Sequence, residues 1–281
     1  MVKVIDTLNY FISDEGKEGM ETFHAAETVI CKLTAVMPGA GAMYPTPEQL
    51  IALMDESGVE KVFLTRLLMF SYLNKKPFES STTEQLGEVL RKYPDRFVGI
   101  ATYNPYRITD SLLEIEKGVK EYGFKGVFVH IFGFDIALDD KKMYPLFAKC
   151  VELDIPVCLQ VGYVLEGMPS EGGRPILLDK IALDFPGLRI VGTHTGYPWC
   201  EELIAMAYKF ENVYFGVSAH FPRYLDPSVV RYINTRGRDK VIFGTNSIPF
   251  KPMLSQIEEL GLKEEVKEKL LRENAIKVFK L

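Results

Sequence analysis

Histidine side chains stand at the ends of two short apolar segments of this sequence. His194 lies in GTHTG, and His130 ends the apolar part of the run GVFVHIF. Because the ordinary pKa of histidine is about 6.5, His194 could act as a general base, a general acid or a donor to an oxyanion. The alternative is a structural histidine that is hydrogen-bonded beneath its loop. His130 either lines a pocket or is buried with both of its nitrogens satisfied.

Amide and phenol side chains follow other apolar segments. Gln160 ends the segment VCLQ, and Asn246 follows VIFGT. Their carboxamides could bind a substrate carbonyl or carboxylate, or they could bond to each other. Tyr10 and Tyr163 could donate phenolic hydrogen bonds, although bulky rings can also simply fill space. These four residues are candidate substrate-binding residues.

Charged side chains offer a second kind of contact. Arg174 follows the EGG stretch and could anchor a substrate carboxylate, because its planar guanidinium matches two carboxylate oxygens. It could equally be an exposed charge without a role. Arg66 is either a substrate clamp or, as we favour, an ion-pair partner at the rim of the fold. Ser218 and His220, in SAHFPRY, are expected in a loop or an interface rather than in catalysis.

A metal centre is poorly supported by the ligand types available. The chain has 4 histidines and contains neither an HxH nor an HExxH pattern. A metal site at the ends of parallel strands usually needs several histidine and carboxylate ligands that converge on one ion. We therefore expect no metal and no other cofactor, and we expect the purified protein to carry no stoichiometric Zn²⁺, Mn²⁺ or Fe²⁺.

The elements that must position these residues alternate between strand and helix. Most of the strand segments are short apolar runs rich in Val, Ile and Phe, as in strands buried on both faces. They cover residues 2–10, 59–67, 96–103, 126–132, 155–161, 188–193, 213–217 and 240–244. Helices are expected over 82–92, 109–122, 140–153, 198–210 and 227–235, and from residues 47, 175, 253 and 263.

Eight strand–helix units in 281 residues predict a (β/α)8 TIM barrel in a single domain, residues 1–281. A doubly wound open sheet is the alternative, but no glycine-rich phosphate loop follows the first strand. In a TIM barrel the active site lies at the carboxyl ends of the strands. That end of the predicted barrel carries His130, Gln160, His194 and Asn246, so the fold brings the candidate residues to one rim.

Composition narrows the class of partner. The chain is 47% hydrophobic and 25% charged with a formal net charge of −5, which excludes disorder and makes nucleic-acid binding unlikely. No apolar segment approaches the ~20 residues of a membrane span, and the N-terminus lacks the apolar core of a secretory signal. We expect a cytoplasmic protein whose 4 cysteines form no disulfide framework. The segment FPRYL and Trp199 suggest a homodimer interface.

Several motifs in one order resemble a known family. They are YPLFAKCVELDIPVCLQVG, LDFPGLRIVGTHTGYPW, ENVYFGVSAH and RGRDKVIFGTN. The chain is similar to the amidohydrolase-related family of TIM-barrel hydrolases and decarboxylases, the group that includes aminocarboxymuconate-semialdehyde decarboxylase. The resemblance runs from Val4 to the C-terminal helix and is strongest between Tyr144 and Asn246. It implies a TIM barrel and a hydrolase or decarboxylase activity.

The resemblance also implies where a metal would be held. The family has an HxH pair after the residue that matches Asp6, and this chain has Leu8 and Tyr10 there. A strand-five histidine ligand falls at Gln160, a second loop histidine falls at Tyr163, and the strand-eight aspartate falls at Asn246. His194 matches the family's strand-six histidine. The resemblance therefore implies a divergent member that has lost most of its metal ligands and its strand-eight base.

Two hypotheses follow. In the first, the chain is a metal-independent enzyme that hydrolyses or decarboxylates a small organic acid, ester or lactone, with His194 as its acid–base group. In the second, it is a catalytically silent barrel that binds a small ligand or a protein partner. A mouth lined by His194, His130 and Arg174 would favour the enzyme, and a mouth filled by Leu8, Tyr10 and Tyr163 would favour the silent barrel.

Overall fold

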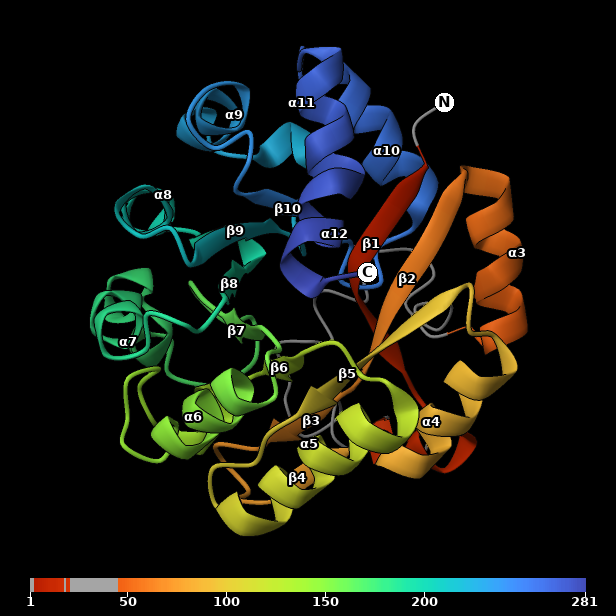
Figure 1. The fold of residues 1–281 in the computed structure, drawn as a ribbon, viewed down its shortest axis with the longest axis vertical. Coiled ribbons are helices and arrows are strands. Elements are labelled where there is room, and N and C mark those ends of the chain that lie inside the picture. Colours follow the sequence, from red (N-terminus) through yellow and green to blue (C-terminus); the bar gives the residue numbers. More distant parts are fainter. Residues whose placement is uncertain (1–2, 18, 21–44) are drawn as a thin grey trace.

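Eight parallel strands form the centre of the molecule. The computed structural model describes residues 3–17, 19–20 and 45–281. Neighbouring strands pair in the order β1-β2-β5-β6-β7-β8-β9-β10, with helices around them (Figure 1). The strands are β1 (Val4–Phe11), β2 (Val59–Arg66), β5 (Phe97–Thr102), β6 (Val127–Val129), β7 (Val157–Gln160), β8 (Ile190–Thr193), β9 (Val213–Val217) and β10 (Val241–Phe243). The predicted TIM barrel is confirmed.

The first and last strands meet and nearly close the barrel. The Asn246 backbone N–H donates to the Leu8 carbonyl at 2.8 Å, and the Thr7 hydroxyl donates to the Phe243 carbonyl at 2.7 Å. The opposite, amino-terminal end of the barrel is covered by α12 (Asn274–Phe279), whose Phe279 ring lies 4.6 Å from the Phe63 ring on β2. The carboxyl ends of the strands therefore form the mouth.

Helices follow the strands as the pattern predicted. They are α3 (Pro47–Ser57), α4 (Thr83–Lys92), α5 (Ile108–Tyr122), α6 (Tyr144–Glu152), α7 (Leu178–Asp184), α8 (Cys200–Lys209), α9 (Pro227–Asn234), α10 (Phe250–Glu259), α11 (Glu264–Glu268) and α12. Helix α3 begins with a capping box between Thr46 and Gln49, which satisfies backbone donors of its first turn. Helix α6 begins four residues later than expected, because Asp140–Met143 forms a turn before Pro145 sets the first helical turn.

Short elements connect the barrel units. The single-turn helices are η2 (Phe132–Phe134), η3 (Glu171–Gly173), η4 (Pro175–Leu177), η5 (His194–Gly196), η6 (Pro222–Tyr224) and the π-helical η7 (Lys269–Glu273). A hairpin of β3 (Leu68–Phe70) and β4 (Pro77–Glu79), which the sequence did not predict, follows β2. Its Phe70 ring stacks on Phe134 at 5.0 Å. The hairpin thus packs on the loop that follows β6.

Alternation along the strands produces two apolar cores. One core fills the barrel and includes Phe63, Ile100, Phe128, Cys158 and Val191. The other packs the outer faces of the strands against the helices and includes the intervening residues of the same strands. Because successive side chains of a strand point to opposite faces, the next inward positions after Phe128 and Cys158 are those of His130 and Gln160.

No described helix combines the length and the apolar composition that crossing a membrane requires.

The described cysteines Cys150, Cys158 and Cys200 are buried and free, as expected, and Cys31 lies outside the described residues. His24 also lies outside them.

Candidate functional site

The strand register brings three of the candidate residues to one arc of the mouth. Val129 of β6 pairs with Leu159 of β7, and Gln160 pairs with Thr193 of β8. His130, Gln160 and His194 therefore lie on consecutive strands, and Ser218 follows β9 next to them. We call the set His130, Gln160, Thr193, His194 and Ser218 the histidine arc. All five side chains are buried.

Two hydroxyls contact one nitrogen of the His194 ring. The His194 Nδ1 lies 3.1 Å from the Ser218 Oγ and 3.0 Å from the Thr193 Oγ1. The His194 backbone N–H also donates to the Ser218 Oγ at 3.1 Å, and the Phe128 ring stacks at 6.5 Å. Among the described residues no hydrogen-bond partner contacts the His194 Nε2. The ring is thus fixed from one side and unpaired on the other.

Burial changes the proton chemistry expected of His194. Removal from water, with smaller contributions from His220 and His130, lowers the pKa of His194 to about 3. The expectation that His194 titrates near neutrality is therefore replaced by an imidazole that stays neutral there. Of the roles predicted for it, the donor to an oxyanion fits this state better than the general base or acid.

His130 is buried without hydrogen-bond partners. Its Nδ1 and Nε2 both lack a partner among the described residues, and its ring packs edge-on against Phe132 at 5.2 Å. Burial lowers the pKa of His130 to about 4. A neutral imidazole carries one donor and one acceptor, and leaving either unpaired in the interior costs about 1–3 kcal/mol. Neither interpretation of His130 is met in full, because the buried ring is unsatisfied and His130 is not among the residues that line the small cavity described below.

The opposite arc of the mouth, where β10 meets β1, is closed by hydrogen bonds. The Tyr10 hydroxyl donates to the Asn246 Oδ1 at 2.7 Å, and the Tyr10 ring packs edge-on against Phe128 at 6.2 Å. The Asn246 carboxamide is thus paired with Tyr10 rather than with Gln160. The Gln160 carboxamide has no hydrogen bond within the described part of the chain.

A buried carboxyl group organises this second arc. Asp6 accepts hydrogen bonds from the Leu8 and Thr245 backbone N–H groups, the Asn9 Nδ2 and the Thr245 hydroxyl, the last at 2.6 Å. The Ser247 hydroxyl donates to the Asn9 Oδ1 at 2.7 Å. Burial raises the pKa of Asp6 to about 6 although these hydrogen bonds lower it. We call the set Asp6, Asn9, Tyr10, Thr245, Asn246 and Ser247 the seam.

The remaining candidates lie apart from both sets. The Arg174 guanidinium pairs with Glu202 and, at 3.4 Å, with Glu171, and it lies over the Trp199 ring at 5.3 Å. Its role as a carboxylate anchor stays a prediction that would require these ion pairs to open. The half-buried Tyr163 packs against Tyr197 at 5.6 Å, and burial raises the pKa of its hydroxyl.

Arg66 occupies the rim as an ion-pair partner, which is the interpretation that we favoured. Its guanidinium contacts Glu114 at 2.8 Å and Glu79 at 3.3 Å, and it donates to the Ser81 carbonyl at 3.0 Å. Both carboxylates compensate its charge, so it does not present a free cation to the mouth.

The positions at which the family resemblance implies metal ligands do not fit a metal ion. Leu8 has no donor atom, and the Tyr10 hydroxyl and the Asn246 Oδ1 are bonded to each other. Neutral amide and phenol oxygens are weak ligands for Zn²⁺ or Mn²⁺ compared with imidazole and carboxylate. Among the described residues, no group of three or more His, Cys, Asp or Glu side chains could hold a metal ion.

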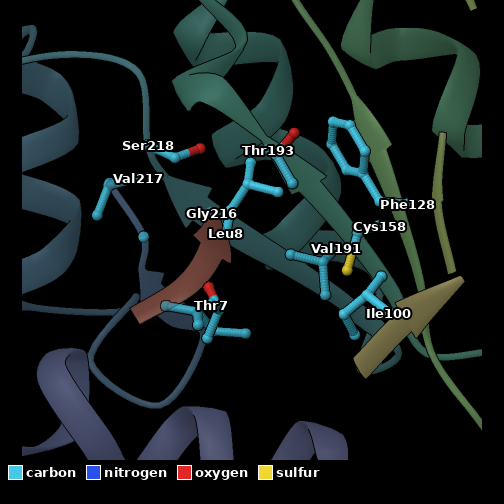
Figure 2. Close-up of a pocket in the computed structure, with 12 residues that line it drawn as sticks. Thr7, Leu8, Ile100, Phe128, Cys158, Val191, Thr193, Gly216, Val217 and Ser218 are labelled. Atoms are coloured by element: carbon cyan, nitrogen blue, oxygen red, sulfur yellow. The ribbon is translucent and has the colours of Figure 1, made fainter. Parts of the chain in front are cut away.

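A small cavity lies below the histidine arc. Its lining includes Thr193, Ser218, Leu8, Phe128 and Cys158, and Figure 2 shows them around the end of the barrel interior. The centre of a water molecule has about 10 Å³ in which to move, which is space for roughly one water. Leu8 and Tyr10 are both buried, so they fill the space on the seam side as the sequence suggested.

Backbone strain concentrates at the same end of the barrel. Five non-glycine residues after β8, β9 and β10 have φ between 59° and 64°: His194, Thr195, Ala219, Asn246 and Ser247. Such conformations cost about 1–3 kcal/mol each and cluster at functional sites. Here they turn the chain sharply at the mouth, where His194 and Asn246 are presented.

The sequence did not predict the partners of His194. Ser218 was expected in a loop or interface, and Thr193 and Asp6 were not considered as site residues. Strand alternation contained a signal, because GTHTG and GVSAH each place a hydroxyl at an inward position of adjacent strands.

Comparison with known proteins is consistent with this geometry. The family model described as Amidohydrolase matches residues 73–281. A curated relative, the 2-keto-4-carboxy-3-hexenedioate hydratase of Sphingobium sp. (strain NBRC 103272 / SYK-6), is 28% identical over 151 residues. The match covers 44% of this chain and 43% of the relative, so it spans less than half the length of that protein.

Solved structures share the fold over nearly the whole chain. An uncharacterised TIM-barrel protein of Bordetella bronchiseptica has a TM-score of 0.80 at 22% identity and 99% coverage of both chains. The 5-carboxyvanillate decarboxylase of Novosphingobium aromaticivorans, complexed with manganese and 4-hydroxy-3-methoxy-5-nitrobenzoic acid, has a TM-score of 0.76 at 20% identity. That match covers 100% of this chain and 96% of the decarboxylase.

Proposed function

Because the chain belongs to the amidohydrolase family, we propose that it is an enzyme that hydrolyses or decarboxylates a small organic acid, ester or lactone at the histidine arc. In this proposal the reaction requires no metal at the strand-end positions Leu8, Tyr10 and Asn246. The observation that carries the proposal is the environment of His194. Two hydroxyls hold one ring nitrogen, and the other is left without a protein partner.

A neutral imidazole can assist either reaction in the same way. In the hydrolysis of an ester or lactone, water adds to the carbonyl carbon, its proton passes to solvent, and the carbonyl oxygen becomes negative. The C–O bond to the alcohol then breaks, and the alcohol oxygen takes a proton from solvent. Loss of CO₂ from an acid with a neighbouring carbonyl leaves an electron pair that the carbonyl oxygen accepts. A hydrogen-bond donor aimed at that oxygen stabilises both transition states. His194 would supply that donor, with Gln160 and His130 orienting the substrate.

The names of the relatives support small oxygenated organic compounds as the substrate class of this chain. Their names describe the decarboxylation of 5-carboxyvanillate and the hydration of 2-keto-4-carboxy-3-hexenedioate. We extend only the substrate class to this chain. The paired Arg66 and Arg174 argue against simple transfer of either activity, because neither guanidinium is free to hold a carboxylate.

The test is a panel of esters, lactones and aromatic acids assayed with the wild-type protein and with His194→Ala, which leaves no side-chain donor. We expect turnover of at least one compound, and a loss of about 10²–10³-fold in kcat for the variant, as for removal of an oxyanion donor. Circular dichroism and Tm would establish that the variant is folded. Turnover that His194→Ala leaves intact would remove His194 from the mechanism.

Absence of turnover across the panel, together with a rise in Tm in the presence of benzoate or a lactone, would favour a silent binding barrel instead. Prior treatment with a chelator should not change the activity if the reaction needs no metal. The homodimer also stays a proposal. Exposed Tyr224 on η6 supports it, and light scattering that gave a monomer at micromolar concentration would refute it.

A further inference from the structure

The hydrogen bonds of Ser218 determine where its proton points. Its Oγ accepts the buried backbone N–H of His194 at 3.1 Å, so the hydroxyl proton is free to be donated elsewhere. Among the described residues the acceptor within reach is the Nδ1 of His194, also at 3.1 Å. A proton on Nδ1 would leave the Ser218 hydroxyl proton without an acceptor. Such a loss in the interior is costly unless a water in the small cavity that Ser218 lines takes the proton, so the protein partners of Ser218 favour an accepting Nδ1.

Thr193 is compatible with the same assignment. Its Oγ1 lies 3.0 Å from the His194 Nδ1, and its hydroxyl donates to the Leu159 carbonyl at 3.3 Å. Thr193 can therefore direct its proton either to the carbonyl or to Nδ1 without conflict. Since a neutral imidazole carries one proton, an accepting Nδ1 places that proton on Nε2, the nitrogen without a protein partner.

We propose that Ser218 is a positioning residue that holds His194 as its Nε2–H tautomer, and that the site thereby recognises the carbonyl oxygen of an uncharged ester or lactone. The inference rests on the proposed function for its second half, because it names the substrate class of that site. Its first half concerns the tautomer and can be measured without a substrate.

The composition of the histidine arc and the pairing of Arg66 and Arg174 favour an uncharged reacting group. Arg66 pairs with Glu79 and Glu114, and Arg174 pairs with Glu171 and Glu202. The histidine arc itself contributes hydroxyls, a carboxamide and imidazoles. Burying a carboxylate without a cationic partner is strongly unfavourable, whereas a carbonyl oxygen needs only a hydrogen-bond donor.

His130 supplies a second group for the same ligand. Its two ring nitrogens are buried and unpartnered, and the register places it next to Gln160. A ligand with a hydrogen-bonding oxygen could satisfy one of these nitrogens while its carbonyl accepts from the His194 Nε2–H. An ester or lactone offers two such oxygens a short distance apart. The orphaned imidazole thus points to the same ligand class as the tautomer of His194.

The direct experiment is nitrogen NMR of the histidine side chains in the uniformly ¹⁵N-labelled full chain at pH 7.5. Disappearance of one ring signal in His194→Gln assigns that signal to His194. We expect a protonated Nε2 and an unprotonated, accepting Nδ1. A proton on Nδ1 in the wild-type protein would overturn the inference, whatever the enzymatic activity is.

Three variants separate positioning from general structure. Ser218→Ala should allow the Nδ1–H tautomer, in which Nδ1 donates to the Thr193 Oγ1, and should lower kcat about tenfold with little change in KM. Ser218→Thr keeps the hydroxyl and should restore both the tautomer and most of kcat. Thr193→Val is the matched control for the tautomer, because it removes the other hydroxyl and should leave Nε2–H in place. An unchanged tautomer in folded Ser218→Ala contradicts the role of Ser218; if that variant does not fold, the wild-type spectrum decides.

The substrate class has its own readout. We expect γ-butyrolactone or 4-nitrophenyl acetate to be turned over faster than benzoate or 2,6-dihydroxybenzoate is decarboxylated. If only the acids react, the substrate class is wrong while the proposed enzyme function stands. If nothing reacts and His194 is still the Nε2–H tautomer, the proposed function fails and the assignment of Ser218 stands.

Discussion

The two arcs of the barrel mouth differ in how completely their polar side chains are paired. In the seam, each of the six side chains takes part in a hydrogen bond with another residue of the seam. In the histidine arc, His130 has two unpartnered nitrogens, and His194 has a partner on one side only. Unpaired buried polar groups cost free energy, and a bound ligand can offset that cost by pairing with them. The comparison supports our proposal that the histidine arc is the site of function and that the seam is structural.

The difference also locates the divergence from the metal-binding pattern that the family resemblance implies. Three of the implied ligand positions, Leu8, Tyr10 and Asn246, lie at the junction of β10 and β1. There an aliphatic side chain and a phenol–amide hydrogen bond fill the space. Two other positions of that pattern, Gln160 and the retained His194, belong to the histidine arc. In our proposal the chemistry comes from this arc, without the ligands that the seam would have to supply.

The largest effect on activity is expected when one variant from each arc is compared. His194→Ala should lower kcat/KM about 10²–10³-fold, because it removes the donor to the developing oxyanion. Tyr10→Phe should lower it less than about threefold and should cost about 1 kcal/mol of stability, because the Asn246 Oδ1 loses its partner. Steady-state kinetics and urea denaturation measure both. Equal losses of activity in the two variants would mean that the seam belongs to the active site.

A second comparison tests the structural role of the seam. Asp6→Ala should lower the free energy of unfolding by about 3 kcal/mol, because it leaves the Thr245 hydroxyl and N–H without their acceptor and removes one of the two acceptors of the Asn9 amide. Asp14→Ala is the matched control, since its carboxylate is exposed and pairs with Lys17. The control should change stability by less than about 0.5 kcal/mol. A similar small change for Asp6→Ala would contradict the structural assignment.

Acid titration should distinguish the two arcs by the direction in which their contribution to stability changes with pH. The pKa values of His130 and His194 are lowered to about 4 and about 3, so their contribution to stability is complete above pH 6.5 and is lost as the pH falls toward those values. His220, whose pKa is also lowered by burial, acts in the same direction. The pKa of Asp6 is raised to about 6, so its contribution is present below pH 3.8 and is lost as the pH rises to 6. Three histidines act in one direction and one carboxyl group acts in the other. The free energy of unfolding should therefore decrease as the pH is lowered from 6.5 to 4.

Urea denaturation across this range measures the slope. His194→Gln should make the slope shallower by up to about 1.4 kcal/mol per pH unit, the value for one proton. The activity of the wild-type protein should stay flat between pH 5 and 8, because His194 remains neutral. An activity profile that fell with an apparent pKa near 6.5 would instead indicate the acid–base role that the sequence suggested.

The smallest effect is expected from partial restoration of the implied ligand pattern. Asn246→Asp should not bind a metal, because Leu8 and Tyr10 still supply neither imidazole nor carboxylate. Elemental analysis after dialysis should find far less than one Zn²⁺ or Mn²⁺ per chain in both wild type and variant. Stoichiometric metal in the wild-type protein would show that the ligands come from elsewhere in the chain.

The barrel was predictable because it depends on local apolar patterns. The strand over 213–217 was predicted with its observed bounds, and the expected 155–161 contains the observed β7. The hairpin of β3 and β4 was missed, because Leu68–Phe70 continues the apolar run of β2. The polar residues Asn74, Lys75 and Lys76 before Pro77 were a turn signal that was not used. The hairpin's packing partner Phe134 lies more than sixty residues away along the chain.

The sequence predicted where the candidate side chains lie, but it did not predict the pKa of His194 or the hydrogen-bond partner of Asn246. Strand ends identified His130, Gln160 and His194 as neighbours, and the register confirms this. The pKa of His194 depends on burial by the whole mouth, which a local motif does not encode. The partner of Asn246 is Tyr10, 236 residues away, and the sequence offered Gln160 as an equally reasonable choice.

The most direct test of the account is a crystal structure of the protein with the unreactive lactam analogue of its best lactone substrate. The account predicts the lactam carbonyl oxygen within hydrogen-bonding distance of the His194 Nε2, with the Tyr10–Asn246 hydrogen bond intact. A ligand or a metal ion inserted between Tyr10 and Asn246, with His194 out of contact, would contradict it.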